Sequence, residues 1–321
     1  MLEVKDLKKS FSKGVVNKKI LKAVDGVSFT IRERETFGLV GESGCGKTTV
    51  GRLVLRLTEP NSGHVIFNGI DLIDLNKSDM RKIRPKLQIL FQDAESSLHP
   101  KMRIKESVAE PLKLYHLVPE QDIERRVVEL LEMVGLHKEH LNRYPHELSG
   151  GQNQRVVLAR VLSLEPKFIV ADEPTSALDV SVQAQILALM KEMQHKFGFC
   201  SLFVSHDLGV IKKMTDSMGV MYLGKLLETG RTEDIFSNPM HPYTKALMDA
   251  VPIIDLDNGH KRKILEGEMP DPMNPPSGCK FHTRCPDKMD VCIKTEPNMI
   301  DIGNDHKVAC HLFNQLLCVH S

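Results

Sequence analysis

Short apolar runs separated by turn residues fill the first ninety or so residues of the chain. Five of these runs predict β-strands: residues 2–7, 23–31, 36–40, 64–69 and 86–92. The segments NSGHV and FNGI contain the Asn and Gly residues that are typical of hairpin turns. The N-terminal part is therefore predicted to be rich in strands.

The pattern changes near residue 97 and changes again after residue 148. Residues 105–115 and 122–136 have apolar positions at helical spacing with charged outer faces, which predicts a helical insert. Helices and strands then alternate: a helix from Gln152, a strand over 167–172, a helix over 181–197, a strand over 200–205, a helix over 208–214 and two short strands over 218–230.

The helix over 181–197 carries one apolar stripe, in which residues recur at i, i+4, i+8 and i+11. Its members are Val182, Ile186, Met190 and Met193. We interpret this stripe as core packing rather than as a groove for a partner. The alternation of strands and helices predicts an α/β fold with a mostly parallel sheet covered on both faces.

The run GESGCGKTT, from Gly41 to Thr49, follows the apolar run TFGLV and precedes a predicted helix over residues 47–57. It fits the phosphate-loop pattern G-x-x-x-x-G-K-[ST]. Glycines allow backbone N–H groups to surround a polyphosphate, Lys47 can reach the β and γ phosphates, and Thr48 can bind Mg²⁺. The alternative, a glycine-rich turn that binds nothing, does not account for the strand–loop–helix context.

The apolar run FIVADE ends in Asp172 and Glu173. An acid at the end of a buried strand is where a P-loop enzyme holds Mg²⁺, and the following Glu173 can orient or deprotonate water. A merely solvated strand end is the alternative, and the continuous apolar strand that runs into the acids disfavours it.

Composition limits the function further. The chain has 321 residues, 41% hydrophobic and 26% charged, enough for one large domain or two modest ones. The net charge of +1 gives no indication of a nucleic-acid partner. We expect no signal peptide, and no apolar run approaches the ~18 residues of a membrane span, so any membrane spans must come from other chains.

Six motifs occur in the order of the ATP-binding-cassette (ABC) ATPases, which this sequence resembles over about residues 1–255. They are the phosphate loop, FQD at 91–93, LSGGQ at 148–152, FIVADE at 168–173, SALD at 176–179 and SHD at 205–207. The resemblance implies a P-loop NTPase (RecA-like) core of parallel sheet, an antiparallel β subdomain and a helical subdomain that carries the signature motif at about 97–150. Arg34 replaces a frequent turn glycine of this family, at a cost of about 1 kcal/mol if its φ is positive.

The resemblance also implies roles for individual residues. Glu173, His206 and Gln92 would be catalytic, as general base, γ-phosphate contact, and a contact to metal and water. Phe11 would stack on adenine, with packing in a core or loop as its alternative. Thr48, Gln92 and Asp172 would hold Mg²⁺. The nucleotide would be held by Gly41, Glu42, Ser43, Gly44, Cys45, Gly46, Lys47, Thr48 and Thr49.

The signature residues Ser149, Gly151 and Gln152, with Asp179, would close over ATP held by a second subunit. Ser149 and the two glycines after it precede a helix, which makes them a ready anion site. The alternative, an ordinary Ser N-cap, leaves the two glycines unexplained.

Several longer segments narrow the resemblance to the ATPase subunits of oligopeptide/dipeptide importers, nearer the F-type than the D-type. They are FQDAESSLHP, ALDVSVQAQIL, MYLGKLLETG, NPMHPYTKAL and NPPSGCKFHTRCP. This implies an ABC cassette over 1–255 and an oligopeptide-transporter-type C-terminal extension over 256–321. It also implies a D-type ATPase partner, two transmembrane permease subunits, an indirect link to a substrate-binding protein and a peripheral location on the cytoplasmic face of the cell membrane.

Three other functions are weighed against this one. The same machine could import sugars or nickel, because the cassette never touches cargo. A soluble ABC ATPase of DNA repair or translation would need a longer insert or two cassettes. A nucleotide-gated, iron–sulfur-bearing regulator would not need both Glu173 and His206.

Four cysteines of the tail follow the spacing C-x₅-C-x₆-C-x₁₇-C: Cys279, Cys285, Cys292 and Cys310. Four thiolates suit zinc or an iron–sulfur cluster almost equally, and free or structural thiols are a third possibility. The resemblance favours a [4Fe–4S] cluster, which some relatives carry in this tail. Cys318 lies beyond the pattern and is left out. We expect ATP, Mg²⁺ and this cluster as cofactors, with the cluster stabilising the tail and taking no part in ATP chemistry.

Overall fold

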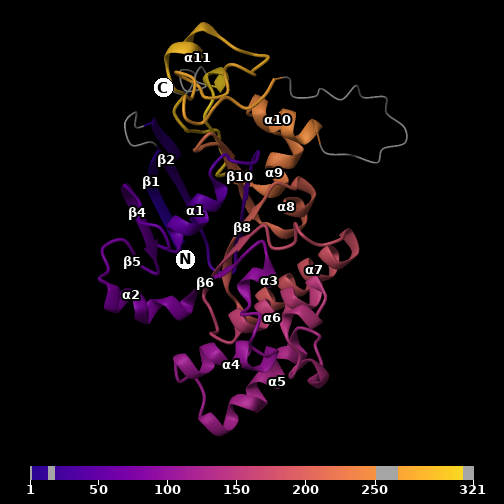
Figure 1. The fold of residues 1–321 in the computed structure, drawn as a ribbon. Coiled ribbons are helices and arrows are strands. Elements are labelled where there is room, and N and C mark those ends of the chain that lie inside the picture. Colours follow the sequence, from indigo (N-terminus) through magenta and orange to yellow (C-terminus); the bar gives the residue numbers. More distant parts are fainter. Residues whose placement is uncertain (1, 14–18, 251–266, 314–321) are drawn as a thin grey trace. The chain divides into compact units, whose positions relative to one another are not determined.

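The computed structural model describes residues 2–13, 19–250 and 267–313 (Figure 1). Residue contacts divide the chain into two compact units. Unit 1 comprises residues 1–31, 36–73 and 204–321, and unit 2 comprises residues 32–35 and 74–203. The expected boundary at 255/256 lies outside the described residues, as does Cys318. Among the described residues, no helix has the length and apolar character needed to cross a membrane.

Unit 1 contains one antiparallel sheet and a run of mixed strands. Its first elements are β1 (Leu2–Lys13), β2 (Lys19–Ile31), β3 (Thr36–Val40), α1 (Lys47–Val54), β4 (Ser62–Phe67) and β5 (Ile70–Asp71). Later in the chain follow α8 (Leu208–Met214), β9 (Ser217–Tyr222), β10 (Lys225–Arg231), α9 (Thr232–Ser237), α10 (Pro242–Asp249), α11 (Asp290–Lys294), β11 (Ile300–Asp301) and β12 (Lys307–Val308).

The antiparallel sheet has the order β2-β1-β4-β5, which is the expected antiparallel β subdomain. Inward positions alternate over the last part of β2, where Val27, Phe29 and Ile31 are buried. The expected hairpin at FNGI is confirmed: Asn68 and Gly69 both have positive φ, as a tight turn between β4 and β5 requires.

The remaining strands of unit 1 are ordered β11-β12-β10-β9-β3. β3 is buried along its whole length and pairs with β9 in parallel, which explains its unbroken apolar sequence. β10 pairs with β9 and β12 in antiparallel fashion, so two short strands of the tail continue the strand order.

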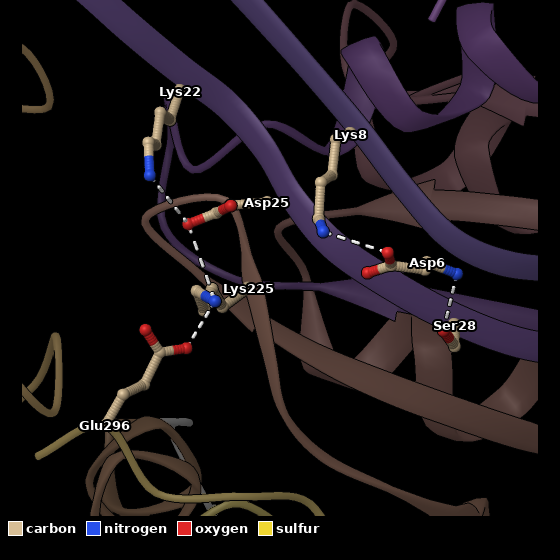
Figure 2. Close-up of polar contacts among 7 residues, drawn as sticks. All are labelled: Asp6, Lys8, Lys22, Asp25, Ser28, Lys225 and Glu296. Carbon is tan, nitrogen blue, oxygen red and sulfur yellow. Dashed lines mark hydrogen bonds and ion pairs between the residues drawn. The ribbon is translucent and has the colours of Figure 1, made fainter. Parts of the chain in front are cut away.

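Ion pairs also hold the tail to the rest of unit 1. Figure 2 shows Lys225 of β10 between Asp25 of β2, at 3.4 Å, and Glu296 of the tail. Glu228, fully buried on β10, accepts hydrogen bonds from the backbone N–H groups of Met240 and His241 at 2.9 Å and lies 2.7 Å from His306 Nε2. The described part of the tail is therefore an integral part of unit 1.

Unit 2 contains parallel strands and the helical insert. Its elements are α2 (Lys77–Ile83), β6 (Leu87–Leu90), α3 (Ala94–Ser97), α4 (Ile104–Leu114), α5 (Ile123–Met133), α6 (Gly150–Leu162), β7 (Phe168–Asp172), α7 (Val180–Phe197) and β8 (Cys200–Ser205), whose last two residues belong to unit 1. The strand order is β8-β7-β6, and β6 pairs with β7 in parallel.

The four longest helices of unit 2, α4, α5, α6 and α7, agree with the predicted pattern. α4, α5 and α6 contact one another, as Figure 1 shows for α4 and α5. The apolar stripe of α7 is core: Ile186, Met190 and Met193 are buried and Val182 is half-buried.

The C-terminal ends of α5 and α1 differ from the prediction, and α5 ends at Met133 rather than at residue 136. α1, in unit 1, ends at Val54 rather than near residue 57. Arg56 has φ 49°, which is outside the right-handed helical region. The helix therefore ends before the apolar run does.

Candidate functional site

The predicted phosphate loop joins β3 to α1 in unit 1. Lys47 is the first residue of α1, and Gly46 precedes it with φ 110°. A Cβ atom on Gly46 would lie 2.1 Å from the backbone oxygen of Ala23, so only glycine fits there. The loop is therefore pressed against another segment of unit 1 at this point.

Lys47 is 5% exposed, and its ammonium group lies inside the loop. Nζ donates to the backbone oxygens of Gly41 at 2.7 Å and Glu42 at 3.0 Å. Gly46 has no side chain to cap the N–H groups at the start of α1, and a Cβ on Gly44 would meet open space. Uncapped N–H groups at a helix N-terminus beside an ammonium group fit an anion such as a phosphate.

The other loop residues differ in exposure. Ser43 and Thr48 are exposed, Thr49 is half-buried and Cys45 is buried. Burial raises the pKa of the Cys45 thiol, so this group stays protonated at neutral pH. Thr48, on the first turn of α1, carries an exposed hydroxyl of the kind that binds Mg²⁺ in phosphate loops.

The acidic strand end lies in unit 2. β7 is buried throughout, and Asp172, its last residue, is 7% exposed. Glu173 follows with φ 49°, an uncommon conformation for a residue with a side chain. Ser176 holds it in place, because its N–H and Oγ donate to the Glu173 carbonyl at 3.2 and 3.1 Å. Backbone strain of this kind is concentrated at functional sites.

Gln92 and His206 each follow the end of a strand. Gln92 is exposed after β6 in unit 2, and Asp93 next to it caps α3 by accepting from Glu95 N–H at 2.9 Å. His206 is exposed after β8 and belongs to unit 1. Its neighbour Asp207 caps α8, so both side chains stand at fixed turns.

Phe11 lies on β1 and is 42% exposed, with the Lys9 ammonium 5.2 Å from the centre of its ring. The alternative weighed from the sequence was packing in a core or loop; the side chain is on a strand and too exposed for a core residue. An exposed ring on a strand is available for stacking.

The signature residues begin α6 in unit 2. Ser149 is the N-cap: its Oγ accepts from Gln152 N–H at 3.3 Å, while Gln152 Oε1 accepts from Ser149 N–H at 2.9 Å. This is a capping box, so Ser149 is also an ordinary helix N-cap, which was the alternative considered from the sequence. A Cβ on Gly151 would lie 2.4 Å from Val182 Cγ1 of α7, so the close packing of α6 on α7 also requires glycine at this position.

Asp179 caps α7. Its Oδ1 accepts from the Ser181 hydroxyl at 2.7 Å and from the N–H groups of Ser181 and Val182 at 3.1 and 3.0 Å. The Ser181 hydroxyl, followed by the Val182 N–H, lowers the pKa of the carboxyl group. Asp179 is thus an exposed carboxylate at a fixed position.

The four tail cysteines lie in unit 1. Cys279, Cys292 and Cys310 are each 7% exposed, Cys285 is half-buried, and Cys279 N–H donates to the Cys292 carbonyl at 2.8 Å. Burial raises the pKa of Cys285 and Cys310 to about 11, with a smaller contribution from the other tail cysteines. Each of these two thiols thus lies within electrostatic range of other cysteines of the set.

Backbone donors face three of these sulfurs. The N–H groups of Phe281, Asp287 and Leu312, each two residues after a cysteine, lower the pKa of Cys279, Cys285 and Cys310 against the larger effect of burial. Nevertheless, within residues 2–13, 19–250 and 267–313, no group of three or more His, Cys, Asp or Glu side chains is arranged to hold a metal ion.

Sequence reasoning missed two residues that contact the phosphate loop. Tyr243 Oη of α10 accepts from Glu42 N–H at 3.0 Å, and Arg284 Nη1 donates to both carboxylate oxygens of Glu42 at 3.0 Å. Both residues lie in segments quoted above for their family resemblance, yet no sequence motif connects them to the loop.

The buried strand, glycine loop and helix N-terminus of unit 1, and the acidic strand end of unit 2, define the fold of a P-loop nucleotide hydrolase. The ABC transporter family model matches residues 24–176, and the model of the oligopeptide/dipeptide transporter C-terminal region matches residues 227–292.

Relatives extend this similarity to nearly the whole chain. The oligopeptide transport ATP-binding protein AppF of Bacillus subtilis is 45% identical over 98% of this chain and 98% of its own length. The oligopeptide transport ATP-binding protein OppF of Salmonella typhimurium is 48% identical over 91% of this chain and 88% of its own.

Solved structures agree on the fold. The ATP-binding cassette MJ0796, a dimer in a post-hydrolysis state with ADP and Pi, matches at a TM-score of 0.65 and 30% identity over 72% of this chain and 99% of its own. The chain belongs to the ATP-binding subunits of the ABC transporter family, in the branch that carries the oligopeptide/dipeptide transporter C-terminal region.

Proposed function

We propose that the chain is the ATP-hydrolysing subunit that powers an ABC importer of di- and oligopeptides. The observation that carries the proposal is the end-to-end similarity to oligopeptide transport ATP-binding proteins, tail included. The family accounts for ATP hydrolysis, and the tail model accounts for the peptide branch. This similarity does not favour the alternative cargoes, sugars or nickel, or a soluble ABC ATPase.

The residues of unit 1 bind the nucleotide. Lys47 and the N–H groups at the start of α1 hold the phosphates, because an ammonium group and a helix N-terminus are the favourable surroundings for a polyphosphate. Phe11 stacks on adenine, and His206 contacts the γ-phosphate. Support comes from the exposure of the Phe11 and His206 side chains.

The residues of unit 2 serve hydrolysis. By their match to the family's motifs, Thr48, Gln92 and Asp172 would hold Mg²⁺, which would neutralise charge on the phosphates when bound. Glu173 takes the proton from the attacking water and Gln92 orients that water. The fixed, strained turn at Glu173 supports this role, because a general base must be held in one position.

The unit of function is a pair of cassettes. Ser149, Gly151, Gln152 and Asp179 close over ATP held by the second cassette, and the dimeric state of the similar MJ0796 cassette supports this. The second cassette is a D-type ATPase, two permease subunits span the membrane, and the pair lies at its cytoplasmic face. A substrate-binding protein delivers the cargo without touching this chain. Residues 1–255 form the cassette and residues 256–321 its C-terminal extension.

Purification of the native complex from its membrane tests this assembly. We expect four kinds of chain: this ATPase, a homologous second ATPase and two permeases, with ATPase activity of the complex above that of the isolated chain. A complex that contains two copies of this chain and no other ATPase would contradict the heterodimer. An isolated chain that co-purifies with nucleic acid and no permease would contradict the importer.

We propose in addition that the four tail cysteines hold a [4Fe–4S] cluster. The mutual electrostatic effects of the thiols and the N–H donors that face three sulfurs support it, because backbone N–H groups stabilise ligating thiolates.

Anaerobically purified protein tests the cluster. We expect a brown protein with about four irons and four acid-labile sulfides per chain. Cys285→Ser should bleach it, whereas Cys200→Ser, a buried cysteine on β8 far outside the pattern, should leave iron and colour unchanged. Colourless protein with one zinc per chain would contradict the cluster and leave a four-cysteine site.

A further inference from the structure

The C-terminal tail supplies a buried cation to the phosphate loop. Arg284 precedes Cys285, and its Nη1 lies 3.0 Å from both carboxylate oxygens of Glu42, the second residue of the loop. The Arg284 side chain is only 7% exposed and the Glu42 side chain 28%, so this ion pair is largely removed from water. Ion pairs in such surroundings are screened far less than surface pairs.

Glu42 is held at each of its polar groups. Its N–H donates to Tyr243 Oη at 3.0 Å, its backbone oxygen accepts from Lys47 Nζ at 3.0 Å, and its carboxylate accepts from Arg284. α10, the loop lysine and the tail therefore fix one loop residue from three directions. Lys47 Nζ donates to the Glu42 carbonyl, so a movement of α10 or of the tail that shifts Glu42 would also shift Lys47.

The tail segment that carries Arg284 is fixed by an aromatic anchor. Phe281 is fully buried, and its ring centre lies 5.5 Å from that of Tyr222 and 5.3 Å from that of Tyr243. The Arg284 guanidinium lies 6.0 Å from the centre of the Tyr222 ring. Phe281 and Arg284 are three residues apart, so one short tail segment places both the anchor and the cation.

The charge of Glu42 is unfavourable for its own loop. A carboxylate in the segment that wraps a polyphosphate repels it, and the repulsion is strong where water is partly excluded. Arg284 compensates that charge and keeps the carboxylate turned toward the tail. Arg284 thus offsets the repulsion between the Glu42 carboxylate and the phosphates, and it keeps the Glu42 side chain in one orientation.

We propose that Arg284 is a positioning residue for nucleotide binding, acting through Glu42 and the phosphate loop. This proposal rests on the proposed assignment of the loop to ATP. On this proposal, the C-terminal tail contributes to nucleotide binding.

Equilibrium binding of MgATP to the full-length chain tests the proposal with a double-mutant cycle. The variants are Arg284→Gln, Glu42→Gln and the two combined, with Arg284→Lys as the conservative change. Lys288→Gln is the matched control, because it removes one exposed charge from the same tail. Thermal unfolding of each variant reports whether it is folded.

We expect Arg284→Gln to raise the Kd for MgATP about tenfold and Arg284→Lys to raise it less. Glu42→Gln removes the carboxylate through which Arg284 acts, so this variant supplies the background for the double-mutant cycle. In that background Arg284→Gln should change the Kd less than about threefold. In the complex, the KM for ATP should follow the Kd while kcat stays within about twofold.

Equal effects of Arg284→Gln in the wild-type and Glu42→Gln backgrounds would overturn the proposal, and so would a folded Arg284→Gln variant that binds MgATP like the wild type. If Arg284→Gln does not fold, Arg284→Lys decides: a Kd for MgATP equal to that of the wild type in this variant would overturn the proposal. Failure of the ATP assignment itself is recognised separately, because Lys47→Ala would then leave MgATP binding unchanged.

Discussion

At the scale of single residues, the phosphate loop depends on two glycines for different reasons. Gly46 lies against backbone, since a Cβ there would stand 2.1 Å from the Ala23 oxygen, whereas a Cβ on Gly44 would meet nothing within 4 Å. Both have positive φ, at 110° and 79°. Gly44 leaves space for a phosphate, and Gly46 allows the loop to pack against the neighbouring segment.

Replacement of these glycines by alanine separates the two reasons. Gly44→Ala should cost only conformational strain, about 1–2 kcal/mol. Gly46→Ala should lower the free energy of unfolding by this strain and by about 1–3 kcal/mol more, because its Cβ would clash with the Ala23 backbone oxygen. Denaturant unfolding of the full-length chain measures both. Equal losses of stability in the two variants would contradict this account of the loop.

Sequence reasoning also identified one strained residue. Arg34 stands in place of a frequent turn glycine of the family, and the structure gives it φ 61°. In contrast, nothing in the sequence indicates the positive φ of Glu173, because a strand followed by an acid is compatible with many turns. The identity of the acidic pair was predictable, but its backbone strain was not.

At the scale of elements, uniformly buried strands were the easiest to predict. β3, β7 and β8 are buried along their whole lengths, so their sequences are unbroken apolar runs. Their ends also located Asp172 and His206, because a polar residue after such a run marks the end of the strand. α6 was expected from Gln152 and begins two residues earlier, at Gly150.

Short helices and helix ends were less predictable. α2, α9 and α10 have six to eight residues, which is too short for a clear apolar period, and they were missed. Asn76 caps α2, because its side-chain oxygen accepts from Asp79 N–H at 3.0 Å. At α6 the difficulty is different: the same residues form a helix cap and match the signature motif, so the sequence alone does not separate the two roles.

At the scale of the whole molecule, the tail is where sequence and structure differ most. Residues 42 and 284 are 242 positions apart, and no periodicity or spacing predicts that they form an ion pair. From the sequence, the tail cysteine site was expected to stabilise the tail and to take no part in ATP chemistry, because it follows His206 by more than seventy residues. This distance along the chain does not keep the tail away from the loop in space, since β12 and the Phe281 anchor hold the tail within unit 1.

The central claim is that this chain hydrolyses ATP with its own general base. Single-turnover hydrolysis of MgATP by the full-length chain tests it most directly, with Glu173→Gln compared with the wild type. Glu192→Gln, which changes an exposed glutamate of α7, is the matched control.

We predict that Glu173→Gln binds MgATP with nearly the wild-type Kd and hydrolyses it about 10²–10⁴-fold more slowly, because a positioned general base contributes a factor of this size. Glu192→Gln should keep the wild-type rate. A Glu173→Gln variant that hydrolyses MgATP at the rate of the wild type would contradict the claim.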